Sequence, residues 1–238
     1  MRALARIVAE ADGRGGTRLA RLRGEPPLQL RHTPDGSATA TVHLIGSAAG
    51  PLGGDDLRIE IEVGEGASLC VRTVAASIAL PGRDGALSRT TVTATVAAGG
   101  ELRWLPEQLV AAAGCLHQAT STVELAGGAR LLWREELVCG RHDEQPGDAV
   151  VSTIVDYDGA PLLRQSLTIG PGTPGWNGPA VLGGARATGS LLLVDPEALP
   201  GPPVVLADTA VRMPLSGPAT LVSATAPDAH VLRGFLDV

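Results

Sequence analysis

Apolar residues fall on every second position through much of the chain, the spacing of a strand with one buried face. Residues 58–63 read RIEIEV, and residues 88–96 alternate in the same way between hydroxyl-bearing and small apolar side chains. The run at 68–74 is rich in β-prone residues. These patterns predict a chain that is built mainly of short β-strands.

Several of the predicted strands are joined by a similar glycine corner. Each corner places glycines between an alternating run and a leucine-led strand, and the copies lie at 64–69, 98–104 and 125–133. Glycine permits the positive φ angles that a sharp reversal requires. Copies about 34 and then about 28 residues apart fit stacked coils of β-strand, in which each coil covers its neighbour. Consecutive hairpins of a β-sandwich have the same pattern, so the corners leave both folds open.

The end of the chain predicts two short helices. The first is expected at 204–213 and the second at 229–236, where a proline and an aspartate directly precede it. No interdomain linker interrupts the sequence. We therefore predict a single β-domain over 1–238, with C-terminal helical segments at about 204–238.

Composition excludes several classes of function. The 238 residues are 44% hydrophobic, enough for a large core, but only 2% aromatic, so few side chains are available to stack on bases or sugars. The net charge of −6 does not favour binding to the phosphate groups of nucleic acid. The sequence shows no membrane span, no signal-peptide pattern and no disulfide framework among its three cysteines. We expect a cytoplasmic protein that binds neither nucleic acid nor membrane.

Enzyme motifs are absent or misplaced. GPGTPG at 170–175 matches the dinucleotide-binding pattern, but its prolines forbid the helix that must begin there. Glycoside hydrolases use a pair of carboxylates as catalytic residues, and the chain has such pairs, for example Glu60/Glu62 and Glu135–Glu136. Glu60 and Glu62 share the polar face of one strand, however, and are more simply solvated. A β-helical carbohydrate-active enzyme stays open as an alternative, although the aromatic platforms and signal peptide expected of it are missing.

One cysteine–histidine pair has a spacing found in metal sites. Cys115 and His117 stand at positions i and i+2, on one side of the chain if it is extended. A third ligand would have to come from elsewhere, and a buried thiol beside a surface histidine explains the pair more simply. The sequence therefore predicts no permanent metal or cofactor, and leaves open a weak path lined by carboxylates and water.

An ordered set of short motifs resembles the family of the urease accessory protein UreD, called UreH in some species. These motifs are GGD at 53–55, VGEGA at 63–67, TVAAS at 73–77, WLPEQ at 104–108, GR at 140–141 and YDGAPL at 157–162. The likeness covers roughly residues 28–195. It departs from the family pattern at Val74 and at the exchanged Glu107–Gln108, and the C-terminal part is short.

The resemblance implies a right-handed β-helical body with small C-terminal helices and a non-enzymatic role as a urease maturation chaperone. Proteins of this family bind UreF, which recruits the GTPase UreG, and dock on apo-urease so that nickel reaches its active site. A dimeric UreD–UreF assembly, with a tunnel for Ni²⁺ through it, goes with this role. Oxygen ligands release such an ion, whereas thiolate or imidazole cages trap it.

On this resemblance, five motif positions are the candidates that line a transient nickel route or order its corners: Asp55, Thr73, Ser77, Glu107 and Arg141. Plainer roles are open to them, such as a turn acceptor for Asp55, a surface ion pair for Arg141, and strand or corner packing for the two hydroxyls. Segment 204–238 is the candidate contact with UreF. A β-rich interaction module with no metal role is the remaining alternative.

Overall fold

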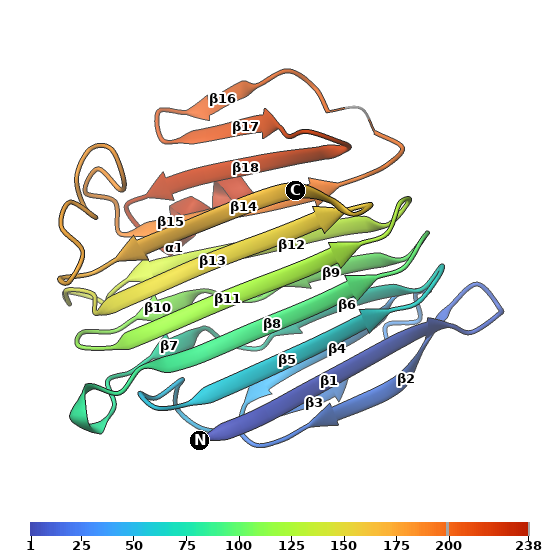
Figure 1. The fold of residues 1–238 in the computed structure, drawn as a ribbon, viewed down its shortest axis with the longest axis horizontal. Coiled ribbons are helices and arrows are strands. Elements are labelled where there is room, and N and C mark those ends of the chain that lie inside the picture. The colour runs from blue at the N-terminus through green and yellow to red at the C-terminus, as the bar shows by residue number, and fades with distance from the viewer. Residues whose placement is uncertain (199, 238) are drawn as a thin grey trace.

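The computed structural model describes residues 1–198 and 200–237 and arranges its strands in two facing sheets (Figure 1). The first sheet has seven strands in the order β14-β13-β11-β8-β5-β1-β2. Their bounds are β1 (Arg2–Ala11), β2 (Thr17–Gly24), β5 (Asp56–Val63), β8 (Ser88–Val96), β11 (Leu116–Leu125), β13 (Asp148–Tyr157) and β14 (Ala160–Ile169). The alternation predicted for 58–63 and 88–96 therefore lies in β5 and β8, side by side.

The second sheet has eleven strands, with β16-β17-β18-β15-β12-β9-β6-β4-β3 in order and the short β7 and β10 beside this path. Their bounds are β3 (Leu28–His32), β4 (Ala40–Gly46), β6 (Ser68–Thr73), β7 (Ser77–Ala79), β9 (Glu101–Leu105), β10 (Leu109–Ala111), β12 (Arg130–Cys139), β15 (Ala187–Val194), β16 (Val204–Ala207), β17 (Ala210–Pro214) and β18 (Ala219–Ala226). A single 3₁₀ turn (Arg83–Gly85) precedes β8, and the helix α1 (Ala229–Leu236) follows β18.

The chain passes back and forth between the two sheets, and its central strands are parallel to their neighbours. In the first sheet β1, β5, β8, β11 and β13 pair in parallel, and in the second β4, β6, β9 and β12 do so. The result is a β-solenoid of about four turns, closed at both ends by antiparallel strands. The predicted stack of β-coils is confirmed, and a sandwich of consecutive hairpins is excluded.

The glycine corners stack on one another at one edge of this solenoid. Gly66, Gly99 and Gly128 have φ angles of 64°, 67° and 82°, which only glycine adopts without strain. The Cβ that a side chain would add at Gly99 lies 3.8 Å from the N of Gly66, and the one at Gly128 lies 3.8 Å from the N of Gly99. The repeated corners noted in the sequence are thus one column of the solenoid.

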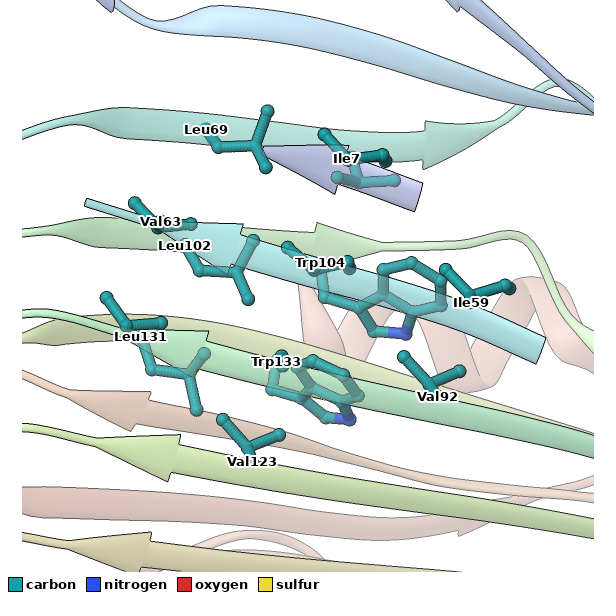
Figure 2. Packing of buried hydrophobic residues seen from close by; sticks show 14 of the residues in the cluster. Ile7, Ile59, Val63, Leu69, Val92, Leu102, Trp104, Val123, Leu131 and Trp133 are labelled. Carbon is teal, nitrogen blue, oxygen red and sulfur yellow. The ribbon is translucent and has the colours of Figure 1, made fainter. Parts of the chain in front are cut away.

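The largest core cluster fills the space between the sheets, and aliphatic side chains from both of them form most of it (Figure 2). Trp104 of β9 and Trp133 of β12 stack inside it, with ring centroids 5.2 Å apart. The pairing of β9 and β12 in parallel register places the two indoles opposite each other. Two of the few aromatic residues of the chain therefore lie together in the core, where they flank the candidate site described below.

The C-terminal prediction is half right. Residues 229–236 are helical as expected, and Asp228 caps the helix by accepting a hydrogen bond of 2.8 Å from the N of Val231. Residues 204–213 are not a helix: they lie in β16 and β17, which form a hairpin on β18. Their β-branched residues suit an edge of the sheet, and this tertiary pairing overrides the weak helical pattern. Val238, the end of the predicted segment, lies outside the described residues.

The only helix among the described residues other than the 3₁₀ turn is α1, with eight residues. No helix in this part of the chain has the length and apolar content needed to cross a membrane.

Candidate functional site

The second sheet is interrupted at one level of the solenoid. β9 ends at Leu105 and β10 begins at Leu109, so β12 pairs with β9 as far as Trp133 and with β10 only from Leu137. Residues 134–136 therefore have no ladder partner on this side of β12. Pro106 lies in the gap and has no N–H to donate. The sequence thus breaks the ladder where a proline enters it.

A second break lies directly beside the first. β6 pairs with β9 as far as Arg72, and β7 pairs with β10 from Ser77, which leaves residues 74–76 outside the ladder. Backbone groups freed by the breaks find other partners. The N of Glu107 donates to Thr73 Oγ1 at 2.9 Å, and the N of Ser77 donates to the O of Gln108 at 2.9 Å.

A cavity of about 150 Å³ lies between the sheets at this level. Its polar wall residues come from both sheets and from the breaks: Thr73, Ser77, Thr90, Glu107, His117, Ser121, Glu135, Glu136, Thr153, Gln165, Thr188 and Ser190. Trp104 also lines it. The ladder break thus coincides with an internal space that carries hydroxyl, carboxylate and imidazole groups.

A neighbouring cavity of about 250 Å³ reaches toward β3, β4 and the GGD motif. Both cavities have the following residues in their walls: Leu44, Pro51, Ile59, Thr73, Ser77 and Thr90. Thr73 and Ser77, at the two ends of the β6–β7 break, therefore face both spaces. Together the cavities extend from Asp55, in the wall of the second, to Glu136, in the wall of the first.

Glu135 is the acid held by groups inside the first cavity. Its carboxylate accepts hydrogen bonds from Ser121 Oγ at 2.8 Å, from Trp133 Nε1 at 3.1 Å, and from Thr153 Oγ1. Among the described residues no arginine or other cation pairs with it. Its neighbours Trp133 and Leu137 are buried in the core, so strand alternation turns Glu135 toward the same side. A carboxylate whose hydrogen-bond donors are all neutral can attract a cation.

Glu107 and Glu136 belong to an ion-pair network that connects the cavity wall to α1. Arg233 of α1 binds Glu136 (Nε–Oε1 2.5 Å) and Glu107 (Nη2–Oε2 3.2 Å). Arg134 lies 3.1 Å from Glu136 and 3.0 Å from Asp237. Burial and the nearby charge of Arg233 lower the pKa of Arg134. Burial opposes protonation of Arg233 as well, but its hydrogen bonds to Glu136 and Glu107 outweigh this, and its pKa is raised.

His117 is 2% exposed and lines the same cavity. Its Nδ1 lies 2.9 Å from Ser88 Oγ, and its Nε2 is buried with no hydrogen-bond partner among the described residues. Burial lowers the pKa of His117 to about 4, so the imidazole is neutral at pH 7 and one of its two ring nitrogens carries a lone pair. His117 is therefore a buried polar group of the cavity and not the surface histidine that the simpler interpretation expected.

Cys115 is in a different environment from His117. It lies in the turn before β11, belongs to a separate apolar cluster, and is absent from the wall of the first cavity. Burial raises the pKa of its thiol to about 11. Among the described residues, no group of three or more His, Cys, Asp or Glu side chains is placed to hold a metal ion. Cys115 fits the simpler interpretation of a buried free thiol.

The five route candidates separate into three groups. Thr73, Ser77 and Glu107 meet at the ladder breaks and line the first cavity. Asp55 lines the second cavity and also fits its plainer role as a turn acceptor, since it binds the N of Leu52 at 2.9 Å and the N-terminal amine at 2.6 Å.

Arg141 lies outside both cavities. It is an exposed loop residue and pairs with Glu144, with an Nη2–Oε1 distance of 2.6 Å. The hydrogen bonds from Arg141 lower the pKa of Glu144 to about 2. This arrangement corresponds to the surface ion pair that was the plainer role open to Arg141.

Sequence reasoning missed three residues of this site. The sequence pattern indicates Glu135 only as half of an acid pair and does not indicate Arg134 or Arg233. Three consecutive charged residues, 134–136, interrupt the otherwise apolar stretch 131–138, and this interruption is the signal that points to Glu135. Nothing local marks Arg233, because its partner Glu136 lies 97 residues earlier in the chain.

The fold is a β-solenoid whose apolar core contains one polar cavity, and comparison with known proteins identifies the family of this solenoid. The family model of the UreD urease accessory protein matches residues 1–236. The chain therefore belongs to the UreD urease accessory protein family, and the resemblance seen in the motifs is confirmed. Membership in this family gives the chain a role in urease maturation.

Relatives support this assignment over the full length of the chain. The chain is 49% identical to the urease accessory protein UreD of Streptomyces avermitilis, over 100% of this chain and 95% of the relative. It is 50% identical to urease accessory protein UreD 3 of Streptomyces griseus, with 100% and 95% covered. It is 46% identical to urease accessory protein UreD of Frankia alni, with 98% and 90% covered.

Proposed function

We propose that this protein is a non-catalytic scaffold through whose interior Ni²⁺ passes on its way into apo-urease. The observation that supports this most directly is the polar cavity at the ladder breaks, which carries Glu135 without a cationic partner among the described residues. Hydroxyl and carboxylate oxygens bind Ni²⁺ weakly and release it, as a route requires. The ion is cargo in this proposal, and the protein keeps no permanent metal.

The proposed partners are apo-urease, UreF, and UreG through UreF, in a dimeric UreD–UreF assembly in the cytoplasm. Segment 204–238 is the proposed contact with UreF. In support, the segment exposes apolar side chains: Val205 of β16 is 76% exposed and Val231 of α1 is 40% exposed. Single exposed apolar residues are common, but the described residues of segment 204–238 include three of them, Val205, Leu206 and Val231, which a partner can bury.

The maturation role is tested by urease activity and nickel content in cells that express the urease subunits but lack this gene. We expect inactive, nickel-poor urease that is restored by the wild-type gene. Fully active, nickel-loaded urease in the deletion strain would contradict the proposal and leave an interaction module without a metal role.

The UreF contact is tested separately, by co-purification. Val205→Glu and Val231→Glu are each expected to reduce the UreF recovered with this protein several-fold, because a buried charge at an interface is costly. Val181→Glu is the matched control, since Val181 is 43% exposed on a loop outside the segment. Wild-type recovery with both segment variants would place the UreF contact elsewhere.

A further inference from the structure

The helix α1 covers the ladder break from the outer face of the second sheet. It packs on β12, β15 and β18, and Leu232 and Leu236 are buried beneath it. Gly189 of β15 makes room for this approach: a Cβ there would lie 2.9 Å from Leu236 Cδ1 and 2.6 Å from the O of Glu135. Gly189 also lines the cavity, so only a thin layer separates α1 from the interior.

One guanidinium group on α1 joins two carboxylates of the cavity wall. Arg233 Nη2 lies 3.0 Å from Glu136 Oε2 and 3.2 Å from Glu107 Oε2. Glu136 belongs to β12 and Glu107 to the connection between β9 and β10, so Arg233 spans the break from one side to the other. One oxygen of each carboxylate, Glu107 and Glu136, faces the same positive charge. Two carboxylates bind a divalent cation in a similar arrangement.

Arg134 does not replace Arg233 in this role. Its Nε is near Glu136 but is buried without a properly aligned hydrogen bond, and its Nη1 binds Asp237 at 3.0 Å. The aligned hydrogen bonds to Glu136 come from Arg233. Without Arg233, one guanidinium would face three carboxylates, those of Glu107, Glu136 and Asp237.

The wall of the first cavity also contains an imidazole nitrogen that has no hydrogen-bond partner among the described residues. His117 is 2% exposed, and its Nε2 has no hydrogen-bond partner among the described residues. A neutral imidazole is a common ligand of divalent transition metals. The carboxylates of Glu107 and Glu136 bind a cationic side chain of α1 at the ladder break, and the imidazole of His117 lies in the cavity wall with an unpaired nitrogen. Both observations point to a metal cation as the ligand.

We propose that α1 closes the cavity reversibly and that Arg233 acts as its latch, the side chain that holds α1 in place. In this proposal Arg233 and a divalent transition-metal cation compete for the carboxylates of Glu107 and Glu136. When α1 is displaced, the two carboxylates become a cation site at the mouth of the cavity. A helix of eight residues is not stable alone in water, so its order depends on contacts that a partner can exchange. The inference rests on the proposed passage of Ni²⁺ through the cavity.

The test is Ni²⁺ binding to the isolated protein, followed by tryptophan fluorescence. Trp104 lines the cavity and stacks on Trp133, so a bound paramagnetic cation quenches them, and Trp176→Phe removes the loop tryptophan from the signal. We expect Arg233→Gln to bind Ni²⁺ at least tenfold more tightly than the parent. Adding Glu107→Gln is expected to abolish the gain.

Arg212→Gln is the matched control, because Arg212 is an exposed arginine of β17 for which the described residues show no ion pair. It should bind Ni²⁺ like the parent. Arg233→Met keeps the length of the side chain and serves as the second variant if Arg233→Gln does not fold, as judged by circular dichroism. Parental affinity in a folded Arg233 variant would overturn the latch.

The outcome separates this inference from the proposed function. A gain in Ni²⁺ affinity without any nickel defect in the gene-deletion strain supports the latch and contradicts the maturation route. Nickel-poor urease in the deletion strain together with parental affinity of the Arg233 variants supports the route and contradicts the latch.

Discussion

The hydroxyl of Thr73 accepts a hydrogen bond of 2.9 Å from the backbone N–H of Glu107, 34 residues later in the chain. Each residue lies where a strand of the second sheet stops, Thr73 at the end of β6 and Glu107 between β9 and β10. The bond therefore joins the two ladder breaks across neighbouring turns of the solenoid. Two residues that belong to separate sequence motifs form one structural unit in the cavity wall.

Replacing Thr73 with valine tests this unit. Valine keeps the shape of threonine but leaves the N–H of Glu107 without its acceptor, and it removes the donor to the O of Ala75. We expect a loss of about 1–3 kcal/mol in the free energy of unfolding, measured with denaturant. Thr93→Val on the exposed face of β8 is the control and should change stability by less than about 0.5 kcal/mol. Equal effects of the two variants would show that the bond is not structural.

Gly53, the first residue of the GGD motif, is predicted to tolerate no side chain. A Cβ at Gly53 would lie 2.4 Å from the N of Gly82 and 2.6 Å from the O of Ala86, both backbone atoms that cannot turn aside. Gly53→Ala should destabilise the protein by about 3 kcal/mol, the upper part of the range for overpacking. Gly234→Ala in α1 is the control, since no atom lies within 4 Å and alanine favours a helix. Thermal unfolding should show a lower midpoint for the first variant and an equal or higher one for the second.

His117 should make stability fall in acid. Burial lowers its pKa from 6.5 to about 4, so between these values the unfolded chain binds a proton that the folded chain does not. The free energy of unfolding should therefore decrease as pH drops through this window, by up to about 3 kcal/mol. His117→Asn removes this contribution, and unfolding curves at pH 7 and pH 4.5 measure it. His230→Asn on the exposed side of α1 should keep the parental pH dependence, and parallel profiles for His117→Asn would contradict the prediction.

Glu135 is predicted to be the acid on which the proposed nickel route depends most. Glu135→Gln keeps an acceptor for Ser121 and Trp133 but removes the negative charge from the cavity. We expect a folded protein that loads at least fivefold less nickel into urease in cells, measured as metal per urease active site. Glu124→Gln, on the exposed face of β11, is the control and should load nickel normally. Normal loading with Glu135→Gln would remove Glu135 from the route.

Much of the fold was predictable from local sequence. Alternation in 58–63 and 88–96 fixes which side chains are buried, because successive residues of a strand face opposite sides. The glycines of the corners mark where the chain reverses, because glycine adopts their positive φ angles most readily. The ordered motifs identify the family for a similar reason: GGD includes Gly53, whose close approach to Gly82 admits no side chain.

The site was predictable only in part. Alternation distinguishes inward from outward positions, yet the local pattern around Glu135 does not reveal that three neutral donors on two sheets surround its carboxylate. The ladder breaks depend on register between strands that are about 30 residues apart, and Arg233 finds Glu136 across 97 residues. The helical signal at 204–213 fails for the same reason, since β18 offers a sheet edge that no short window contains.

Local pattern therefore determines the strands, the corners and the family, because these depend on backbone geometry and on the side-chain period within a few residues. Tertiary structure determines where the cavity lies, which groups pair with its charged side chains, and where α1 packs. Those features depend on which distant groups meet inside the solenoid, and their burial then sets the pKa of His117 and joins Arg233 to two acids.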